Sequence, residues 1–152
     1  MPKQSAGILL YRTKDLLEVF LVHPGGPFFK NKDDGSWSIP KGEFLDDEDA
    51  LTAAKREFEE ETGLAIDGSF IKLEPEKLKS GKIIYAWALK GDIDAQGIVS
   101  NTFEIEWPPR SGKMMAFPEV ERAGWFNVTE ASNKLNASQF ALVGQLQTLL
   151  VP

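Results

Sequence analysis

The chain has 152 residues, 42% of them hydrophobic, a net charge of −6 and no cysteine. This length fits one domain, residues 1–152, and the lack of cysteine excludes disulfides and thiolate chemistry. The acidic balance argues against a nucleic acid polymer as partner, because a phosphate backbone requires a basic surface. Neither a membrane-spanning apolar run nor a secretory signal pattern occurs, which favours a cytoplasmic protein without a membrane partner.

The first predicted elements are two strands. Residues 5–12 and 16–23 are rich in branched and aromatic residues and are separated by a polar turn, which predicts a β-hairpin. A long loop rich in glycine, proline and aspartate follows over residues 23–42. Residues 49–62 contain good helix formers without proline or glycine and stop at Gly63, which predicts a helix.

The second half of the chain continues with strands and ends in helices. Strands are predicted over residues 69–75 and 82–91, and residues 100–126 combine short strands with a proline-rich loop. Residues 128–150 predict one or two helices, because leucines recur there at spacings of three and four. This order favours an α/β (α+β) fold with a mixed β-sheet packed between helices.

The predicted helix of residues 49–62 carries an unusual group of glutamates near its end: Glu57, Glu59, Glu60 and Glu61. Like charges at helical spacing repel by about 0.2–0.5 kcal/mol per pair. At about 100° per residue, Glu57, Glu60 and Glu61 share one face, whereas Glu59 points to solvent. Three converging carboxylates suit Mg²⁺ or Mn²⁺, and the alternative is an ordinary solvated acidic face.

An apolar stripe lies next to this acidic face. Leu51, Ala54 and Phe58 fall together on the helical wheel, and such a stripe is expected to pack against the sheet.

The glutamates belong to a longer pattern, residues 42–64, which read GEFLDDEDALTAAKREFEEETGL. This segment resembles the Nudix box, the motif of hydrolases that cut nucleoside diphosphates linked to another moiety. A chance match at one start point has a probability on the order of 10⁻⁸ to 10⁻⁹. Phe58 departs from the family preference for Ile, Leu or Val. The strictly specified positions all match: Gly42, Glu48, Arg56, Glu57, Glu60, Glu61 and Gly63.

The resemblance implies a Nudix α/β/α sandwich with a loop–helix–loop that holds divalent metal, Mg²⁺ or Mn²⁺. By this resemblance, Glu57, Glu60 and Glu61 are the metal ligands. Arg56 would orient a glutamate through an ion pair, and Glu48 would support the site from the loop side.

Two glycines of the motif have structural roles by the same resemblance. Gly42 would start the loop, beside a backbone carbonyl that often completes metal coordination in the family. Gly63 would shape the turn that follows the helix.

Hydrolysis of a pyrophosphate linkage needs neutralised phosphate oxygens, an aligned substrate and an activated water, all of which a metal supplies. A carboxylate then takes the proton of that water. In the family this base is either a box glutamate, here Glu57 or Glu60, or a residue of a later loop, for which Glu119 is the candidate. The alternative for Glu119 is a surface glutamate in a turn. His23, at the end of an apolar strand, is more often structural than catalytic.

Three residues outside the box are candidates for substrate binding. Lys41 lies in a Pro-Lys-Gly sequence that resembles the dinucleoside-polyphosphate and diphosphoinositol-polyphosphate branches, and it would meet the phosphate chain as a point charge. Tyr85 would stack on a base, with core packing as an equal alternative. Arg110 would add positive charge, or would simply be solvated in its loop.

The whole pattern resembles a bacterial subgroup of dinucleoside-polyphosphate hydrolase-like Nudix proteins. The expected function is Mg²⁺-dependent cleavage of a nucleoside polyphosphate, with a dinucleoside polyphosphate as the favoured substrate. The expected binding partner is this small nucleotide or polyphosphate substrate, and a homodimer is one expected oligomeric state. Alternatives are an NTP pyrophosphohydrolase, a diphosphoinositol-polyphosphate hydrolase and a non-catalytic nucleotide sensor. The complete Arg-Glu-x-x-Glu-Glu set argues against the sensor, which has no need of every ligand.

Overall fold

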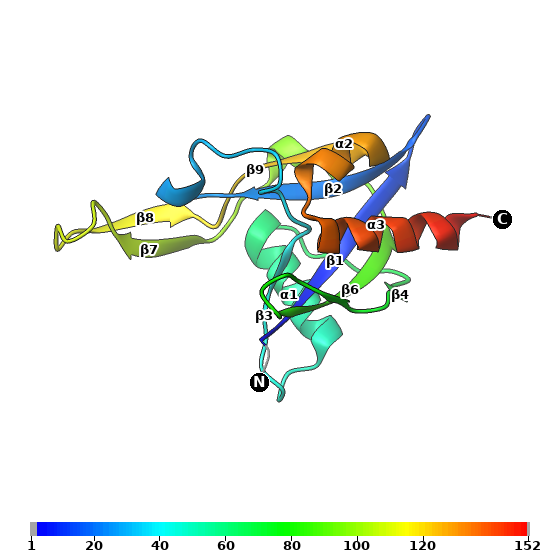
Figure 1. Cartoon of the computed structure of the whole chain (residues 1–152), viewed down its shortest axis with the longest axis horizontal. Coiled ribbons are helices and arrows are strands. Elements are labelled where there is room, and N and C mark those ends of the chain that lie inside the picture. The colour runs from blue at the N-terminus through cyan, green and yellow to red at the C-terminus, as the bar shows by residue number, and fades with distance from the viewer. Residues whose placement is uncertain (1–2, 152) are drawn as a thin grey trace.

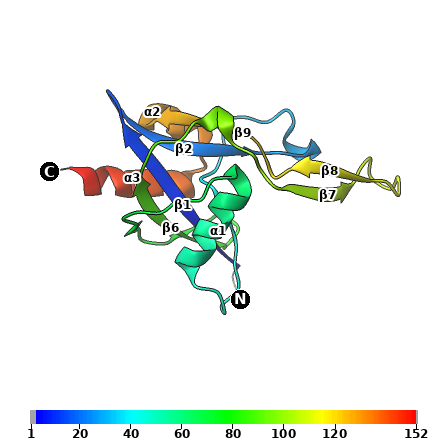
Figure 2. The same ribbon diagram turned by 180° about the vertical axis from the view of Figure 1, so that it is seen from behind.

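A seven-stranded mixed sheet forms the centre of the structure, a computed structural model that describes residues 3–151. Residues 1, 2 and 152, at the ends of the expected single domain, lie outside the described part. Helix α1 (Ala50–Thr62) lies on one face of the sheet, and α2 (Val128–Lys134) and α3 (Ala137–Leu150) lie on the other, as the two opposite views show (Figures 1 and 2). The expected sandwich of a mixed sheet between helices is therefore confirmed.

The sheet has the order β4-β6-β1-β2-β9, with β3 paired to β1 and β5 paired to β6. Only β1 and β6 pair in parallel. The strands are β1 (Gln4–Thr13), β2 (Leu17–Pro24), β3 (Lys41–Glu43), β4 (Ile71–Lys72), β5 (Glu76–Lys77), β6 (Ile83–Lys90) and β9 (Val120–Asn127).

The predicted hairpin is formed by β1 and β2, and both of its faces are buried. Ile8 and Phe20 contribute to an apolar cluster under α1, whereas Leu9 and Leu21 contribute to a second cluster under α3. Strands that are covered on both faces have continuous apolar sequences, because every side chain meets a core. Helices on both sides of the sheet follow from this pattern.

The predicted helix of residues 49–62 is α1, and both of its ends are capped. The Asp49 carboxylate accepts the Thr52 N–H at 3.0 Å, so one free amide of the first turn is satisfied. Gly63 has a φ of 77°, and its N–H donates to the Glu59 carbonyl at 2.8 Å. A left-handed residue of this kind ends a helix with little strain only when it is glycine.

Two helices, α2 and α3, form at the C-terminal end, where the sequence predicts one or two. Asn127 and Glu130 form a reciprocal capping box at the start of α2. Asn136 caps the start of α3, whose buried Leu142, Val143 and Leu146 complete the second apolar cluster. Within residues 3–151, no helix has the length and apolar character needed to cross a bilayer.

The strand predicted over residues 69–75 is present but is shorter than predicted, Ile71–Lys72. This segment contains only β4, and the next pairing, β5, begins after Pro75. Proline cannot donate to a sheet ladder, and Pro75 lies between β4 and β5, which pair with β6 separately.

A separate two-stranded sheet consists of β7 (Thr102–Glu106) and β8 (Met114–Pro118). This hairpin extends away from the main sheet like an arm, and its base lies near the end of α1 (Figures 1 and 2). The proline-rich loop of the sequence connects the two strands at the far end of the arm. Short 3₁₀ turns occur at Pro27–Phe29 and Ala95–Gly97.

Candidate functional site

Arg56 is the centre of the ionic contacts on the acidic face of α1. Its Nε and Nη2 atoms donate to the two carboxylate oxygens of Glu48, both at 3.0 Å. Its Nη1 atom lies 2.9 Å from Glu57 Oε1 and 3.3 Å from Glu60 Oε1. The arginine therefore joins the loop before the helix to two of the converging glutamates. Hydrogen bonding to Glu48, the largest cause, raises the pKa of Arg56.

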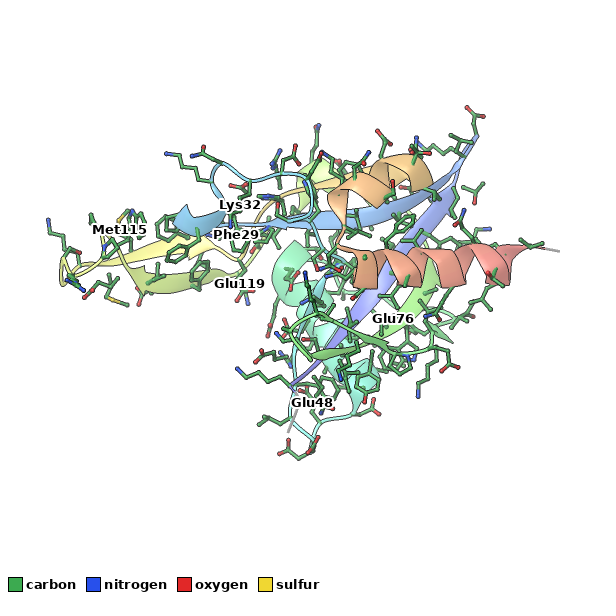
Figure 3. The ribbon with its side chains drawn as sticks, viewed as in Figure 1. Phe29, Lys32, Glu48, Glu76, Met115 and Glu119 are labelled. Atoms are coloured by element: carbon green, nitrogen blue, oxygen red, sulfur yellow. The ribbon has the colours of Figure 1, made fainter. Side chains whose placement is uncertain are left out.

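Glu48 lies in the loop before α1 and forms an ion pair with Arg56 on the helix. In Figure 3, Glu48 is drawn near the N-terminal end of α1, and Glu119 lies beside the opposite end. The bidentate contact with Arg56 lowers the pKa of Glu48. Glu48 thus holds the guanidinium from the loop, as the resemblance implies.

Gly42 lies directly against the Glu57 carboxylate. It belongs to β3, which pairs with the N-terminal half of β1. A Cβ atom at this position would lie 2.0 Å from Glu57 Cδ, too close for any side chain. Burial, followed by repulsion from Glu60, raises the pKa of Glu57. The glycine therefore allows β3 to pass close beside the carboxylate.

Glu61 is the most buried carboxylate of the site, with a relative exposure of 9%. It lines a cavity of about 190 Å³ together with Lys41 and Glu119. Burial, and then repulsion from Glu57, raises the pKa of Glu61 to about 9. The nearby ammonium of Lys41 opposes this shift, but it does not cancel it.

Lys41 is the cation of this cavity. Burial and the neighbouring Lys82 lower its pKa, whereas Glu61, Glu43 and Glu57 act in the opposite direction. Lys82 is itself paired with Glu43 at 2.9 Å. The ammonium of Lys41 therefore faces the carboxylate cluster from β3.

Glu119 reaches the same place from the other half of the chain. It lies between β8 and β9 and lines the same cavity as Glu61. Burial, and then repulsion from Glu60, raises the pKa of Glu119. The structure thus brings Glu119 into electrostatic contact with the box glutamates, although the sequence left open whether it is a surface residue.

The donor atoms of this cluster fit a hard divalent cation. All four carboxylates offer oxygen ligands, and a cation beside Glu61 would stabilise the ionised carboxylate that burial disfavours. Across residues 3–151, however, no three acidic or histidine side chains already form a metal-ligand group. Glu57 and Glu60 contact Arg56 instead, so metal binding requires these two side chains to turn from the guanidinium toward the ion.

The other box and substrate candidates have different surroundings. Gly63 caps α1 beside Val99, whose carbonyl oxygen would lie 2.7 Å from an added Cβ. Tyr85 packs edge-on against Phe44 at a centroid distance of 6.0 Å, next to the apolar cluster under α1. Arg110 is exposed in the loop at the far end of the arm, so the structure does not bring it to the carboxylates (Figure 1).

His23 is fully buried on the face of the sheet opposite the cavity. Its Nδ1 lies 2.9 Å from Glu121 Oε1, and its Nε2 lies 2.9 Å from Ser36 Oγ. The Ser36 hydroxyl donates to the Asp33 carbonyl, and the Trp37 ring packs edge-on against the imidazole. The Ser36 hydroxyl donates its proton to the Asp33 carbonyl and not to His23. The hydrogen bonds of His23 and Ser36 therefore hold the long loop in place and do not form a nucleophilic triad.

Asn101 is a residue of the site that the sequence analysis missed. Its backbone N–H donates to the Glu60 carbonyl at 2.7 Å, and its carbonyl accepts the Glu119 N–H at 2.8 Å. It also lines a second cavity, of about 470 Å³, on the outer side of α1. A contact between backbones that are distant in sequence leaves no local pattern. The other residues around this cavity are Lys55, Arg56, Glu59, Glu60, Ala65 and Ile66.

Solved structures show the same fold. The Ap4A hydrolase of C. elegans, in a binary complex, is 19% identical, covers 96% of this chain and 97% of its own, and has a TM-score of 0.66. The NUDIX domain of NrtR from Shewanella oneidensis, solved with ADP ribose, is 17% identical, with 99% and 90% covered and a TM-score of 0.67. A mutT/nudix family protein of Listeria innocua is 18% identical, with 99% and 95% covered and a TM-score of 0.63.

The sequence comparisons identify the family itself. No curated protein matches the sequence significantly. The NUDIX domain family matches over residues 1–143, which is most of the chain. The chain therefore belongs to the NUDIX domain family, the hydrolase family whose motif residues 42–64 resemble.

Proposed function

We propose that the protein is a Mg²⁺-dependent pyrophosphohydrolase that cleaves a phosphoanhydride bond of a nucleoside polyphosphate, with dinucleoside polyphosphates as its preferred substrates. The observation that carries this proposal is the cluster of four carboxylates beside α1: Glu61 and Glu119 line one cavity, and they are repelled electrostatically by Glu57 and Glu60 respectively. Such a concentration of carboxylates is costly without a cation, and a phosphate chain needs the same cation.

The residues of the cluster have different proposed roles, which depend on their positions. Glu57, Glu60 and Glu61 would hold the metal, which supplies charge neutralisation at the phosphate oxygens when bound. Arg56 keeps Glu57 and Glu60 on one side of the helix through its contacts with both.

Glu119 is the proposed general base. It lines the cavity from a different segment than the box glutamates, so it would be free to take a proton from water while they hold the cation. Lys41 faces the same cavity and provides a positive charge for a phosphate group outside the carboxylate cluster.

The two cavities differ in what they accommodate. Small-molecule sites have volumes of about 300–1,000 Å³. The cavity of about 190 Å³ at Glu61 suits phosphate groups, whereas the neighbouring cavity of about 470 Å³ suits a nucleoside. Glu60 lines the larger cavity and acts electrostatically on Glu119 in the smaller one, so a long phosphate chain would extend past it.

A hydrolysis panel tests the proposal. The purified protein is incubated with diadenosine tetraphosphate, ATP, ADP-ribose and a diphosphoinositol polyphosphate, with Mg²⁺ or with EDTA, and the products are identified by mass spectrometry. We expect Mg²⁺-dependent cleavage with the highest kcat/KM for diadenosine tetraphosphate. Cleavage of another substrate alone would contradict the substrate assignment, and nucleotide binding without any cleavage would identify a sensor.

A further inference from the structure

The segment Val99–Asn101 lies along the C-terminal end of α1. The Val99 N–H donates to the Thr62 carbonyl at 2.8 Å, and the Asn101 N–H donates to the Glu60 carbonyl at 2.7 Å. The last carbonyls of any helix lack partners within the helix, so another segment must supply them. Here that segment is the chain that leads into the arm.

The opposite side of the same segment holds the chain around Glu119. The Asn101 carbonyl accepts the Glu119 N–H at 2.8 Å, and Ser100 Oγ accepts the Val120 N–H at 3.0 Å. The Ser100 hydroxyl donates its own proton to the Asn101 carbonyl at 2.6 Å, which leaves its lone pairs for Val120. On the far side, the Glu119 carbonyl accepts the Gly25 N–H at 3.0 Å.

The segment Val99–Asn101 therefore connects two residues of the site, Glu60 and Glu119, through hydrogen bonds. Glu60 is bonded to it through a helix carbonyl, and Glu119 is bonded to it through its own amide. All of these bonds are made by the backbone except two, and both involve Ser100 Oγ, which accepts the Val120 N–H and donates to the Asn101 carbonyl. Ser100 is thus the only side chain in the connection that a substitution can remove.

We propose that Ser100 is a positioning residue that fixes the Glu119 carboxylate relative to Glu60; this inference rests on the proposed role of Glu119 as the base. Val120 is buried, and its N–H needs an acceptor. Without the hydroxyl, this amide must find another partner, and the chain next to it must shift. Glu119 is the neighbouring residue, so its carboxylate moves with that shift.

The first test compares variants of Ser100. Because a displacement of about 1 Å costs up to a hundredfold in rate, Ser100→Ala should lower kcat by about ten- to a hundredfold with little change in KM. Ser100→Thr keeps the hydroxyl and should keep a kcat close to that of the parent. If Ser100→Ala does not fold, Ser100→Cys replaces it, because a thiol accepts hydrogen bonds only weakly.

Ser138→Ala is the matched control. The Ser138 hydroxyl also ties two distant segments together, through the Lys77 carbonyl at 3.0 Å, but it lies on α3, across the sheet from the site. We expect this variant to keep the parent kcat, which would show that loss of a serine tether by itself does not slow the reaction.

The decisive test is a double-mutant cycle with Glu119→Gln, measured on the nucleotide that the parent hydrolyses fastest. If Ser100 acts through Glu119, Ser100→Ala should cause no further loss of kcat in the Glu119→Gln background. An equal loss in both backgrounds, or a parent-like kcat for Ser100→Ala, overturns the inference and leaves the proposed hydrolase intact. If Glu119→Gln keeps the parent kcat, the proposed role of Glu119 fails and the inference falls with it. If the parent hydrolyses no nucleotide, the proposed function itself fails.

Discussion

Position on the helix separates the four glutamates of α1 from one another. Glu59 is exposed, Glu57 and Glu60 are half-buried beside Arg56, and Glu61 is buried in the cavity. The helical period predicts this division, because residues three and four apart share a face. The period alone does not predict which carboxylate is buried most deeply, since that depends on Lys41 and Glu119 from other segments.

Neutral variants of these glutamates test the proposed metal ligands. Glu57→Gln and Glu60→Gln should each lower kcat by at least about a hundredfold, because an amide is a poor ligand for a divalent cation. Glu59→Gln should leave kcat nearly unchanged, since Glu59 does not line the cavity that contains Glu61 and Glu119. Steady-state kinetics with Mg²⁺ measures all three, and equal losses at Glu59 and Glu60 would contradict the assignment of the face.

Lys41→Met tests the proposed contact with the phosphate chain. A charge-assisted hydrogen bond contributes about 1.5–3 kcal/mol, so kcat/KM for diadenosine tetraphosphate should fall by about ten- to a hundredfold. The shorter ADP-ribose should lose less, because fewer of its phosphate groups reach beyond the metal. Equal losses with both substrates would instead assign Lys41 to the support of Glu61, which faces it in the cavity.

At the level of elements, one face of helix α1 packs in the core and another face carries the carboxylates of the site. Ala54 and Phe58 are fully buried, as the apolar stripe predicts, whereas Leu51 is only half-buried. Phe58 packs against Phe20 of β2 at a centroid distance of 6.0 Å. The residue that departs from the family preference is therefore accommodated by another aromatic ring across the core.

Phe58→Ala should destabilise the protein by about 3–5 kcal/mol, because it leaves a cavity next to the Phe20 ring. Equilibrium unfolding in urea measures this change, and the slope of the transition should stay the same. Glu59→Ala on the exposed face of α1 is the control and should change the free energy of unfolding little. A Phe58→Ala variant as stable as the parent would show that this side chain is not packed in the core.

Elements with strong local signals could be predicted, and those fixed by distant partners could not. Helix α1 has an N-cap, an apolar stripe and a terminal glycine in its own sequence, so its bounds follow from local rules. Strands β4 and β5 have two residues each and exist only because β6 offers an edge to them. The base of the arm depends likewise on hydrogen bonds between Asn101 and Glu60 or Glu119.

At the scale of the whole molecule, metal binding should be linked to stability. A ligand at about a hundred times its Kd stabilises the folded state by about 2.7 kcal/mol, which in a domain of this size raises Tm by about 5–10 °C. We expect such a rise with Mg²⁺ relative to EDTA, measured by differential scanning fluorimetry. Glu60→Gln should reduce the rise and Glu59→Gln should not; identical shifts in both variants would show that Mg²⁺ acts elsewhere.

The arm has a consequence for solubility. In the described structure, β7 and β8 pair only with each other, so each presents an outer edge with free backbone groups. Such edges invite pairing between molecules unless charges or prolines interrupt them. Glu104, Glu106 and Pro118 occupy these strands, and Arg110 and Lys113 occupy the loop at their end. These charged residues and this proline disfavour pairing between the edges of two molecules. A chain in which they are replaced by apolar residues would therefore keep its carboxylate cluster and yet aggregate.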